Sequence, residues 1–292
     1  MANNSLLLLT ALIWGFAFVA QRAGMESVGP FIFNGLRFSL GVLSLLPVLL
    51  IARRRGDRLL PAGGFREIAA WGAAAGAVLF AGASLQQVGI VSTTAGKAGF
   101  ITGLYVVLVP LFGAACGTRS GVSRWSGAVL ALLGLYLISV DEALSVGGGD
   151  FLVLLCAVFF AIHVLLLSRI SPRFHPVPLS MIQYGVCALL SLLFSLGRET
   201  TRSADLAAVW LPILYGGVFS VGIAYSLQVA AQRKAHPTHA AIILSLEGLF
   251  AAVGGFLLLG ERFTGRELAG AVLMLSGMIL SQFSPGRGKG KA

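Results

Sequence analysis

The chain has 292 residues, of which 57% are apolar and 11% charged, and its mean hydropathy is +0.90. A soluble domain carries about 25% charged residues, so this composition excludes an ordinary soluble domain and indicates a multi-pass membrane protein. The formal net charge of +10 does not indicate a nucleic-acid partner, because the basic residues fall in short loops that we expect to face the anionic lipid surface of the cytoplasm.

Apolar runs, taken in chain order, predict an all-α integral membrane protein with ten transmembrane helices, because about 20 apolar residues cross a bilayer core. The first run lacks the basic region of a cleaved signal peptide and continues to Ala20, so we expect it to be retained as a span. The basic, glycine-rich tail at 284–292 is expected to be disordered. The helices are expected at about 5–22, 31–51, 67–90, 95–115, 123–140, 150–169, 178–197, 206–230, 238–259 and 266–283.

Basic residues are unevenly distributed over the predicted loops. With a cytoplasmic N-terminus, the cytoplasmic segments hold 14 Lys and Arg residues and the outer segments hold 6, and Arg37 lies inside a span. The connection after the fifth helix carries Asp141, Glu142 and Asp150 but no base, as expected of an outer loop. The positive-inside rule therefore predicts that both termini face the cytoplasm, and we expect a multi-pass protein of the cell inner membrane.

Two parts of the chain repeat at nearly constant spacing. The tripeptide Ser-Leu-Gln at 84–86 recurs at 226–228, and residues 127–134 match residues 270–277 at six of eight positions. Each copy holds five predicted helices, and five is an odd number, so the second copy must be inverted in the membrane. The sequence thus predicts a 5+5 inverted-topology repeat, with units at 1–143 and 144–283 and a substrate site near the midplane between them.

Small residues spaced by four or seven positions mark faces where helices are expected to approach closely, since lipid provides no hydrophobic force between helices. These pairs are Gly72 and Gly76, Gly99 and Gly103, Gly127 and Gly134, Gly248 and Ala252, and Gly270 and Gly277.

Glu247 is the acidic residue that we place deep inside a span, near the middle of the ninth helix. An ionisable group at that depth costs at least a few kcal/mol, so it predicts a functional site with a specific partner. One hypothesis is a proton-coupling carboxylate, and the other is a hydrogen-bonded residue that bridges helices. At a shift of 142 residues Glu247 stands opposite Tyr105 in the repeat, which places both near the midplane.

Several segments together resemble the EamA family of the drug/metabolite transporter superfamily, and the resemblance covers nearly the whole chain. It implies a 5+5 inverted repeat, alternating access, and export of small metabolites or amino acids. Gly248 stands where many relatives carry Pro, so the ninth helix is expected either to be straighter or to flex at the glycine. The segments are ALIWGF at 11–16, FNGLRF at 33–38, STTAGKA at 92–98, FITGLY at 100–105, SLE at 245–247 and GE at 260–261.

Other polar and aromatic residues are candidates for the substrate pathway. Arg37 offers two parallel donors for a carboxylate or other anion, or else forms an ion pair that locks the fold. Lys97 opens the fourth helix on the outer side, where it attracts anions or marks the interface. For the remaining candidates, packing and helix-to-helix hydrogen bonds are the alternative roles. They are Trp14, Gln86, Tyr105, His163, Tyr184 and Gln228.

The chain is therefore predicted to be a secondary transporter that exports small metabolites such as amino acids, with proton coupling at Glu247 as one possibility. The alternative is an exporter of hydrophobic drugs or lipid-linked carriers. No motif of an enzyme or an ATPase is present, and Cys116, Cys156 and Cys187 lack metal-ligand spacing, so neither cofactor nor metal is predicted. The expected partners are a small-molecule substrate and membrane lipid, and the choice between monomer and homodimer stays open.

Overall fold

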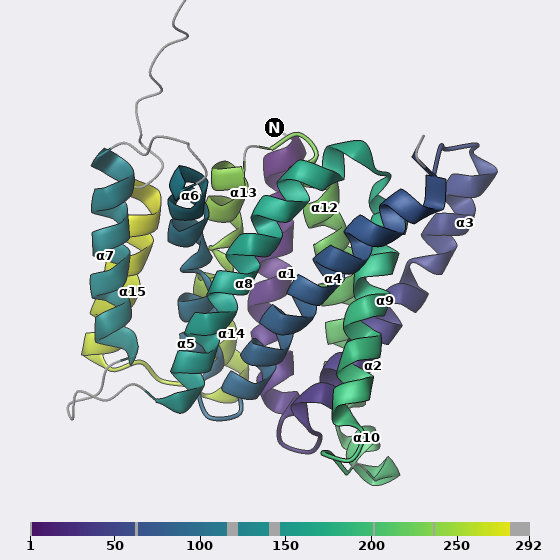
Figure 1. Cartoon of the computed structure of the whole chain (residues 1–292). Helices are drawn as coiled ribbons and strands as arrows, with labels where there is room; N and C mark the ends of the chain where they lie inside the picture. The colour runs from purple at the N-terminus through teal and green to yellow at the C-terminus, as the bar shows by residue number, and fades with distance from the viewer. Residues whose placement is uncertain are drawn as a thin grey trace, which may run out of the picture.

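A computed structural model describes residues 2–61, 64–115, 122–139, 147–200, 202–235 and 237–280. These residues form helices and connecting turns without any strand, as the composition predicts (Figure 1). Cys116, the boundary at 143–144 and the tail at 284–292 lie outside the described residues.

Each of the ten predicted helices corresponds to a helical segment, and most boundaries agree within a few residues. Five segments are single helices or end in one short turn: α1 (Ala2–Gly24), α4 (Gly64–Gly89), α7 (Val122–Ser139), α8 (Gly148–Ile170) followed by the 3₁₀ turn η1 (Ser171–Arg173), and α9 (Pro176–Ser195). Another single helix, α15 (Gly265–Leu280), ends the described chain. The other four segments are interrupted, and their parts are α2 (Pro30–Ser44) with α3 (Leu46–Arg54), α5 (Ala95–Thr102) with α6 (Tyr105–Ala115), α10 (Ser203–Ala208) and α11 (Trp210–Leu214) with η2 (Tyr215–Tyr225) and α12 (Ser226–Gln232), and α13 (Pro237–Leu244) with α14 (Glu247–Leu259).

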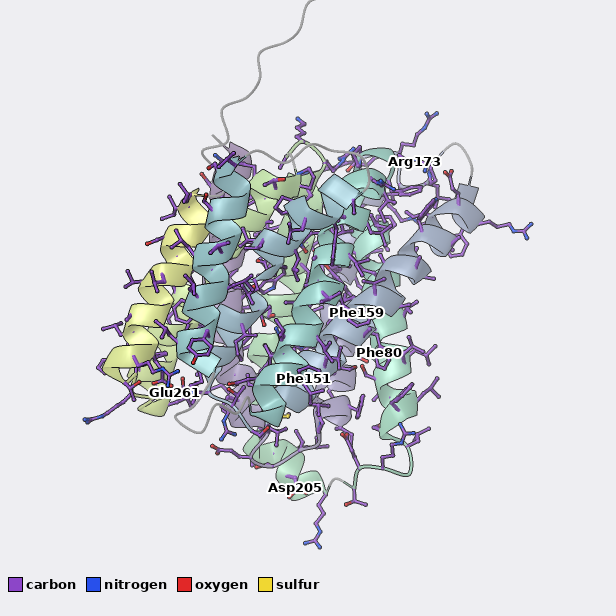
Figure 2. The ribbon with its side chains drawn as sticks, turned by 60° about the vertical axis from the view of Figure 1, so that its left-hand side comes forward. Phe80, Phe151, Phe159, Arg173, Asp205 and Glu261 are labelled. Atoms are coloured by element: carbon purple, nitrogen blue, oxygen red, sulfur yellow. The ribbon has the colours of Figure 1, made fainter. Side chains whose placement is uncertain are left out.

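Eight of these segments are long and apolar enough to cross a membrane. The other two predicted spans, α7 and α15, are the helices that pack side by side at one edge of the bundle in Figure 1. Large apolar side chains such as Phe151 project from the surface (Figure 2), where lipid is the expected solvent. Arg173 and Asp205 lie at opposite ends of the bundle in the same view.

The packing of the helices has the symmetry of an inverted repeat. α4 packs against α8 and α9, and its counterpart η2 packs in the same way against α1 and α2. The end of α4 lies beside the end of α1, since Gln87 Nε2 donates a hydrogen bond to the Gln21 backbone carbonyl at 3.3 Å. The same end of α4 lies beside the beginning of α8, since a Cβ on Gly149 would lie 2.5 Å from the Gly89 oxygen. Because α1 ends where α8 begins, the two halves have opposite orientations.

Glycine pairs bring helices of the two halves into backbone contact, as their spacing predicts. In the α7–α15 pair, a Cβ on Gly134 would lie 2.5 Å from the Gly270 oxygen, and one on Gly277 would lie 2.5 Å from the Gly127 oxygen. α5 crosses α14 in the same manner, since a Cβ on Gly248 would lie 3.1 Å from the Gly99 oxygen. These contacts are possible only without side chains at the crossing points.

The fourth and ninth predicted helices are both interrupted at repeat-related positions, so the expectation of continuous helices at 95–115 and 238–259 is corrected. In α5–α6 the Leu104 amide donates to Ile101 at 3.1 Å, and in α13–α14 the Leu246 amide donates to Ile243 at 3.3 Å. These are bonds to the third preceding residue, which tighten the chain as in a 3₁₀ turn. The ninth helix is therefore interrupted at 245–246 even without a proline.

Two carboxylates from the second half cap helices of the first half on the predicted outer face. Glu199 accepts hydrogen bonds from the Phe31 and Ile32 amides at the start of α2, at 3.0 and 2.7 Å. Glu261 accepts from the Ala95 and Gly96 amides at the start of α5, at 2.7 and 3.0 Å. Each carboxylate satisfies amides that have no partner within their helix and lies at the positive end of the helix dipole.

We expect Gly134→Ala to destabilise the protein by about 1–3 kcal/mol, because the added methyl group collides with backbone rather than with a movable side chain. Gly185→Ala is the matched control, since a Cβ at Gly185 in α9 meets nothing within 4 Å. Thermal unfolding in detergent measures the difference. Equal melting temperatures for the two variants would contradict the close contact between α7 and α15.

Candidate functional site

A cavity of about 30 Å³ lies inside the bundle and is lined by residues from both halves of the chain. Seven of the nine residues predicted for the substrate pathway line it, and they come from seven different helical segments. The seven are Trp14, Arg37, Gln86, Tyr105, His163, Gln228 and Glu247. The cavity is lined in addition by Ala17, Phe18, Gln21, Thr102, Phe160, Val164, Ser220 and Tyr225.

Glu247 reaches the cavity because it is the first residue of α14, directly after the interruption in the ninth helix. A carboxylate at the start of a helix is stabilised by the helix dipole. Glu247 is 4% exposed, and no basic side chain among the described residues lies within 4.0 Å of it. Its carboxyl group therefore faces the cavity without a basic partner among the described residues.

Tyr105 occupies the matching position in the first half, as the first residue of α6. Its hydroxyl interacts with the Glu247 carboxyl and has no partner among the described residues that meets full hydrogen-bond geometry. The interruptions of the two helices thus present a phenol and a carboxyl, in contact with each other, to the same cavity.

Arg37 extends from the interior of α2 and is only 2% exposed. Its Nε donates a hydrogen bond to Asn34 Oδ1 at 2.8 Å. Asn34 is held in turn by a hydrogen bond from its Nδ2 to the Ala83 carbonyl at 3.1 Å. The guanidinium lies 5.0 Å from the centre of the Phe38 ring and 5.9 Å from that of Phe33, which is a cation–π geometry. No carboxylate in the described part of the chain lies within 4.0 Å, so the positive charge is oriented but not neutralised.

An aromatic pair forms one wall. The ring centres of Trp14 and Tyr225 are 4.5 Å apart, and Trp14 Nε1 donates to the Ser220 carbonyl at 3.2 Å. Ser220 and Tyr225 belong to η2, a π-helix, and such helices occur often at functional sites. Tyr225 has electrostatic interactions with both Arg37 and Glu247.

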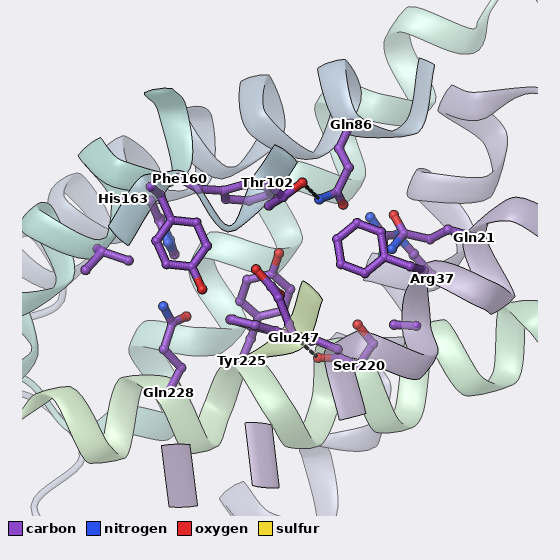
Figure 3. A pocket seen from close by; sticks show the side chains of 15 residues that line it. Gln21, Arg37, Gln86, Thr102, Phe160, His163, Ser220, Tyr225, Gln228 and Glu247 are labelled. Carbon is purple, nitrogen blue, oxygen red and sulfur yellow. Dashed lines mark hydrogen bonds between the residues drawn. The ribbon is translucent and has the colours of Figure 1, made fainter. Parts of the chain in front are cut away.

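Figure 3 shows how the labelled side chains are arranged. Gln21, Arg37 and Gln86 gather at one end of the view, Phe160, His163 and Gln228 gather at the other, and Tyr225 and Glu247 lie between them. His163 Nε2 and Gln183 Oε1 are 2.9 Å apart. The side-chain oxygen of Gln228, Oε1, is buried without a partner among the described residues. Gln86 is bound to Thr102 at 3.1 Å.

Two predicted pathway residues lie elsewhere. Lys97 forms an ion pair with Glu267 at 2.7 Å and lines a separate polar pocket at the predicted outer face, together with Arg22, Asp150 and Glu261. Tyr184 is fully buried outside the cavity lining, where its hydroxyl lies 3.2 Å from Ser226 Oγ and its ring centre 6.0 Å from that of Tyr225.

Sequence reasoning did not select Tyr225, Thr102 or Ser220. Tyr225 lies three residues before Gln228, and Thr102 lies three residues before Tyr105. Residues three apart share a helix face, so this spacing is the signal that could have identified both. No comparable signal marks Ser220, because its contribution is a backbone carbonyl.

Comparison with known proteins gives consistent matches over almost the whole chain. The sequence profile of the EamA-like transporter family matches residues 2–140 and again residues 147–283. An uncharacterized transporter from Archaeoglobus fulgidus is 34% identical over 275 residues, which cover 94% of this chain and 83% of that protein. A probable amino-acid metabolite efflux pump from Salmonella typhimurium is 25% identical, with 96% and 95% of the two chains covered. A crystal structure of an 18% identical protein matches with a TM-score of 0.69 over 96% of this chain and 97% of the other.

We expect Tyr105→Phe to leave the stability unchanged or slightly higher, because it removes a buried hydroxyl that has no partner. Tyr184→Phe is the matched comparison and should cost about 1 kcal/mol, since it breaks the contact with Ser226. Thermal unfolding of both variants checks this expectation. An equal loss in Tyr105→Phe would mean that its hydroxyl is bound within the protein and does not await a ligand.

Proposed function

The chain belongs to the EamA-like transporter family, and we propose that this transporter is a secondary carrier that exports small metabolites such as amino acids by alternating access. One observation carries the proposal: the polar cavity lies between the two inverted halves, at the interruptions of α5–α6 and α13–α14. Inverted-repeat carriers bind substrate at this place, between interrupted helices. The family consists of membrane transporters, and the protein is not an enzyme.

Alternating access requires contacts between the halves that form on one side of the membrane and break when the other side closes. The predicted outer face carries such contacts in the bonds of Glu261 to the start of α5 and in the ion pair of Lys97 with Glu267. Gly260, with φ of 66°, ends α14 and turns the chain toward α5. We infer that these contacts close the outer side, while the glycine crossing of α5 and α14 acts as the pivot.

We further propose that the protein lies in the inner membrane with both termini in the cytoplasm. The distribution of basic residues supports this orientation, with 14 in the proposed cytoplasmic segments and 6 in the outer ones. The units of the rocking motion would be the two five-helix repeats, 1–143 and 144–283.

Export of hydrophobic drugs or lipid-linked carriers is the second candidate function. Its support is an apolar groove of about 350 Å³ between α14 and α15, lined by residues such as Phe256, Phe263 and Leu268. The groove shares no lining residue with the central cavity. Since the cavity carries two charged side chains and several amides, we favour a small polar substrate.

Counterflow in proteoliposomes tests the proposed function. Vesicles loaded with unlabelled amino acids should accumulate at least one labelled amino acid several-fold above empty liposomes. A parallel growth assay exposes cells to toxic dyes and to toxic amino-acid analogues. No flux of any metabolite would contradict the proposal, and rescue from dyes but not from the analogues would favour the second candidate.

For proton coupling, we expect an acidic vesicle lumen to raise amino-acid uptake several-fold, because protons leaving through Glu247 would drive substrate inward. Glu247→Gln should lose this response yet keep measurable counterflow at high substrate concentration, since exchange needs no proton. Asp150→Asn is the control and should respond like the native protein. Native flux that ignores the imposed gradient would make Glu247 a structural residue.

A further inference from the structure

Two buried ionisable side chains, one basic and one acidic, face the central cavity, and neither has an ion-pair partner among the described residues. Arg37 and Glu247 are 2% and 4% exposed. Within the described ranges, the ion pairs shorter than 4.0 Å are Lys97 with Glu267 and Arg173 with Glu67. A buried charge is normally compensated, because its desolvation is costly. The cavity as a whole is neutral, but its two charges are held apart.

Contacts within the fold fix the position of each of the two groups. Asn34 and the ring of Phe38 fix the guanidinium on the α2 side, and the carboxyl starts from the first residue of α14. Tyr225 interacts electrostatically with both, and its ring packs on Trp14. In Figure 3 Glu247 lies between the end that holds Arg37 and the end that holds His163 and Gln228.

We propose that this cavity is a zwitterion site, in which Arg37 binds the carboxylate of the substrate and Glu247 binds its ammonium group. This inference rests on the proposed function and names its specificity-determining residues. An arginine binds a carboxylate through two parallel hydrogen bonds. An ammonium group would supply hydrogen-bond donors and a positive charge to the Glu247 carboxylate, and the Tyr105 hydroxyl interacts with the same carboxyl group.

The third part of the substrate would lie at the far end of the cavity. Phe160 provides an apolar surface there, and the unpaired carbonyl oxygen of Gln228 provides an acceptor. We assign the α-substituent to this end, whereas recognition of the two charges is common to all substrates. A ligand with only one charge leaves either Arg37 or Glu247 uncompensated, which is the physical basis for rejecting it.

The experiment uses three matched ligands of each of two amino acids. The first set is L-leucine, L-leucinamide and 4-methylpentanoate, and the second is L-phenylalanine, L-phenylalaninamide and 3-phenylpropanoate. In each set the amide keeps only the ammonium group and the deaminated acid keeps only the carboxylate, so each amino acid is compared with two single-charge analogues. Each ligand competes against the amino acid mixture in counterflow, and each is tested separately for protection against thermal unfolding. We expect at least one amino acid to act at a concentration tenfold or more below that of either single-charge analogue.

The variants assign the two charges. In Arg37→Gln, the amino acid should act at the same concentration as its amide. In Glu247→Gln, it should act at the same concentration as its deaminated acid. Arg37→Lys should keep the preference over the amide, and Arg173→Gln, which changes a charge outside the cavity, should leave both ratios unchanged. If Arg37→Gln does not fold, the ligand series on the native protein and Arg37→Lys decides.

Single-charge analogues that act as well as the amino acids would overturn the inference, as would the same change of both ratios in both variants. Flux of other metabolites with no effect of either amino acid would also overturn it, while leaving the proposed function intact. Protection from unfolding by amino acids without any flux would have the opposite meaning, because the zwitterion site would stand and the transport proposal would fail.

Discussion

The crossing of α5 and α14 is the contact on which the centre of this protein depends. A Cβ on Gly248 would lie 3.1 Å from the Gly99 oxygen, and one on Gly99 would lie 2.5 Å from the Ala251 Cβ. Backbones approach this closely only where side chains are absent. The crossing joins the two halves a few residues from the interruptions that precede Tyr105 and Glu247, so a packing requirement and the polar groups of the cavity occur at the same level of the bundle.

The two halves share a scaffold but differ in chemistry. Repeat-related interruptions present a phenol in one half and a carboxyl in the other. The same asymmetry appears at the predicted outer face, where Glu199 and Glu261 from the second half cap α2 and α5 of the first. An inverted repeat therefore provides the symmetric frame for rocking, whereas the differences between its copies provide a cavity with distinct ends.

Polar atoms inside the bundle fall into two groups, those that form hydrogen bonds between helices and those that have no partner among the described residues. Some bind helices together, such as the Tyr215 hydroxyl, which donates to the Ile13 carbonyl at 3.0 Å, and Thr10, whose hydroxyl reaches the Ala224 carbonyl at 3.3 Å. Others, such as Tyr105 and Gln228, are buried with an atom that no described residue satisfies. Unsatisfied polar atoms are costly in low dielectric, and three of them, on Gln21, Tyr105 and Gln228, line the central cavity, where a ligand would supply the missing partners.

The sequence by itself determined the class, the helical segments and the inverted repeat, because hydropathy, charge placement and spacing are local properties that the bilayer constrains strongly. It placed Glu247 near the midplane and identified the faces that carry Gly127 with Gly134 and Gly270 with Gly277 as packing faces. Only the tertiary structure decided which way each side chain points. Lys97 pairs with Glu267 and Tyr184 packs beside the cavity, whereas Tyr225 and Thr102, which the sequence analysis did not select, line it. The reason is physical: helix rotation and crossing depend on contacts between distant segments, and the tight turn at 245–246 has no proline to mark it in the sequence.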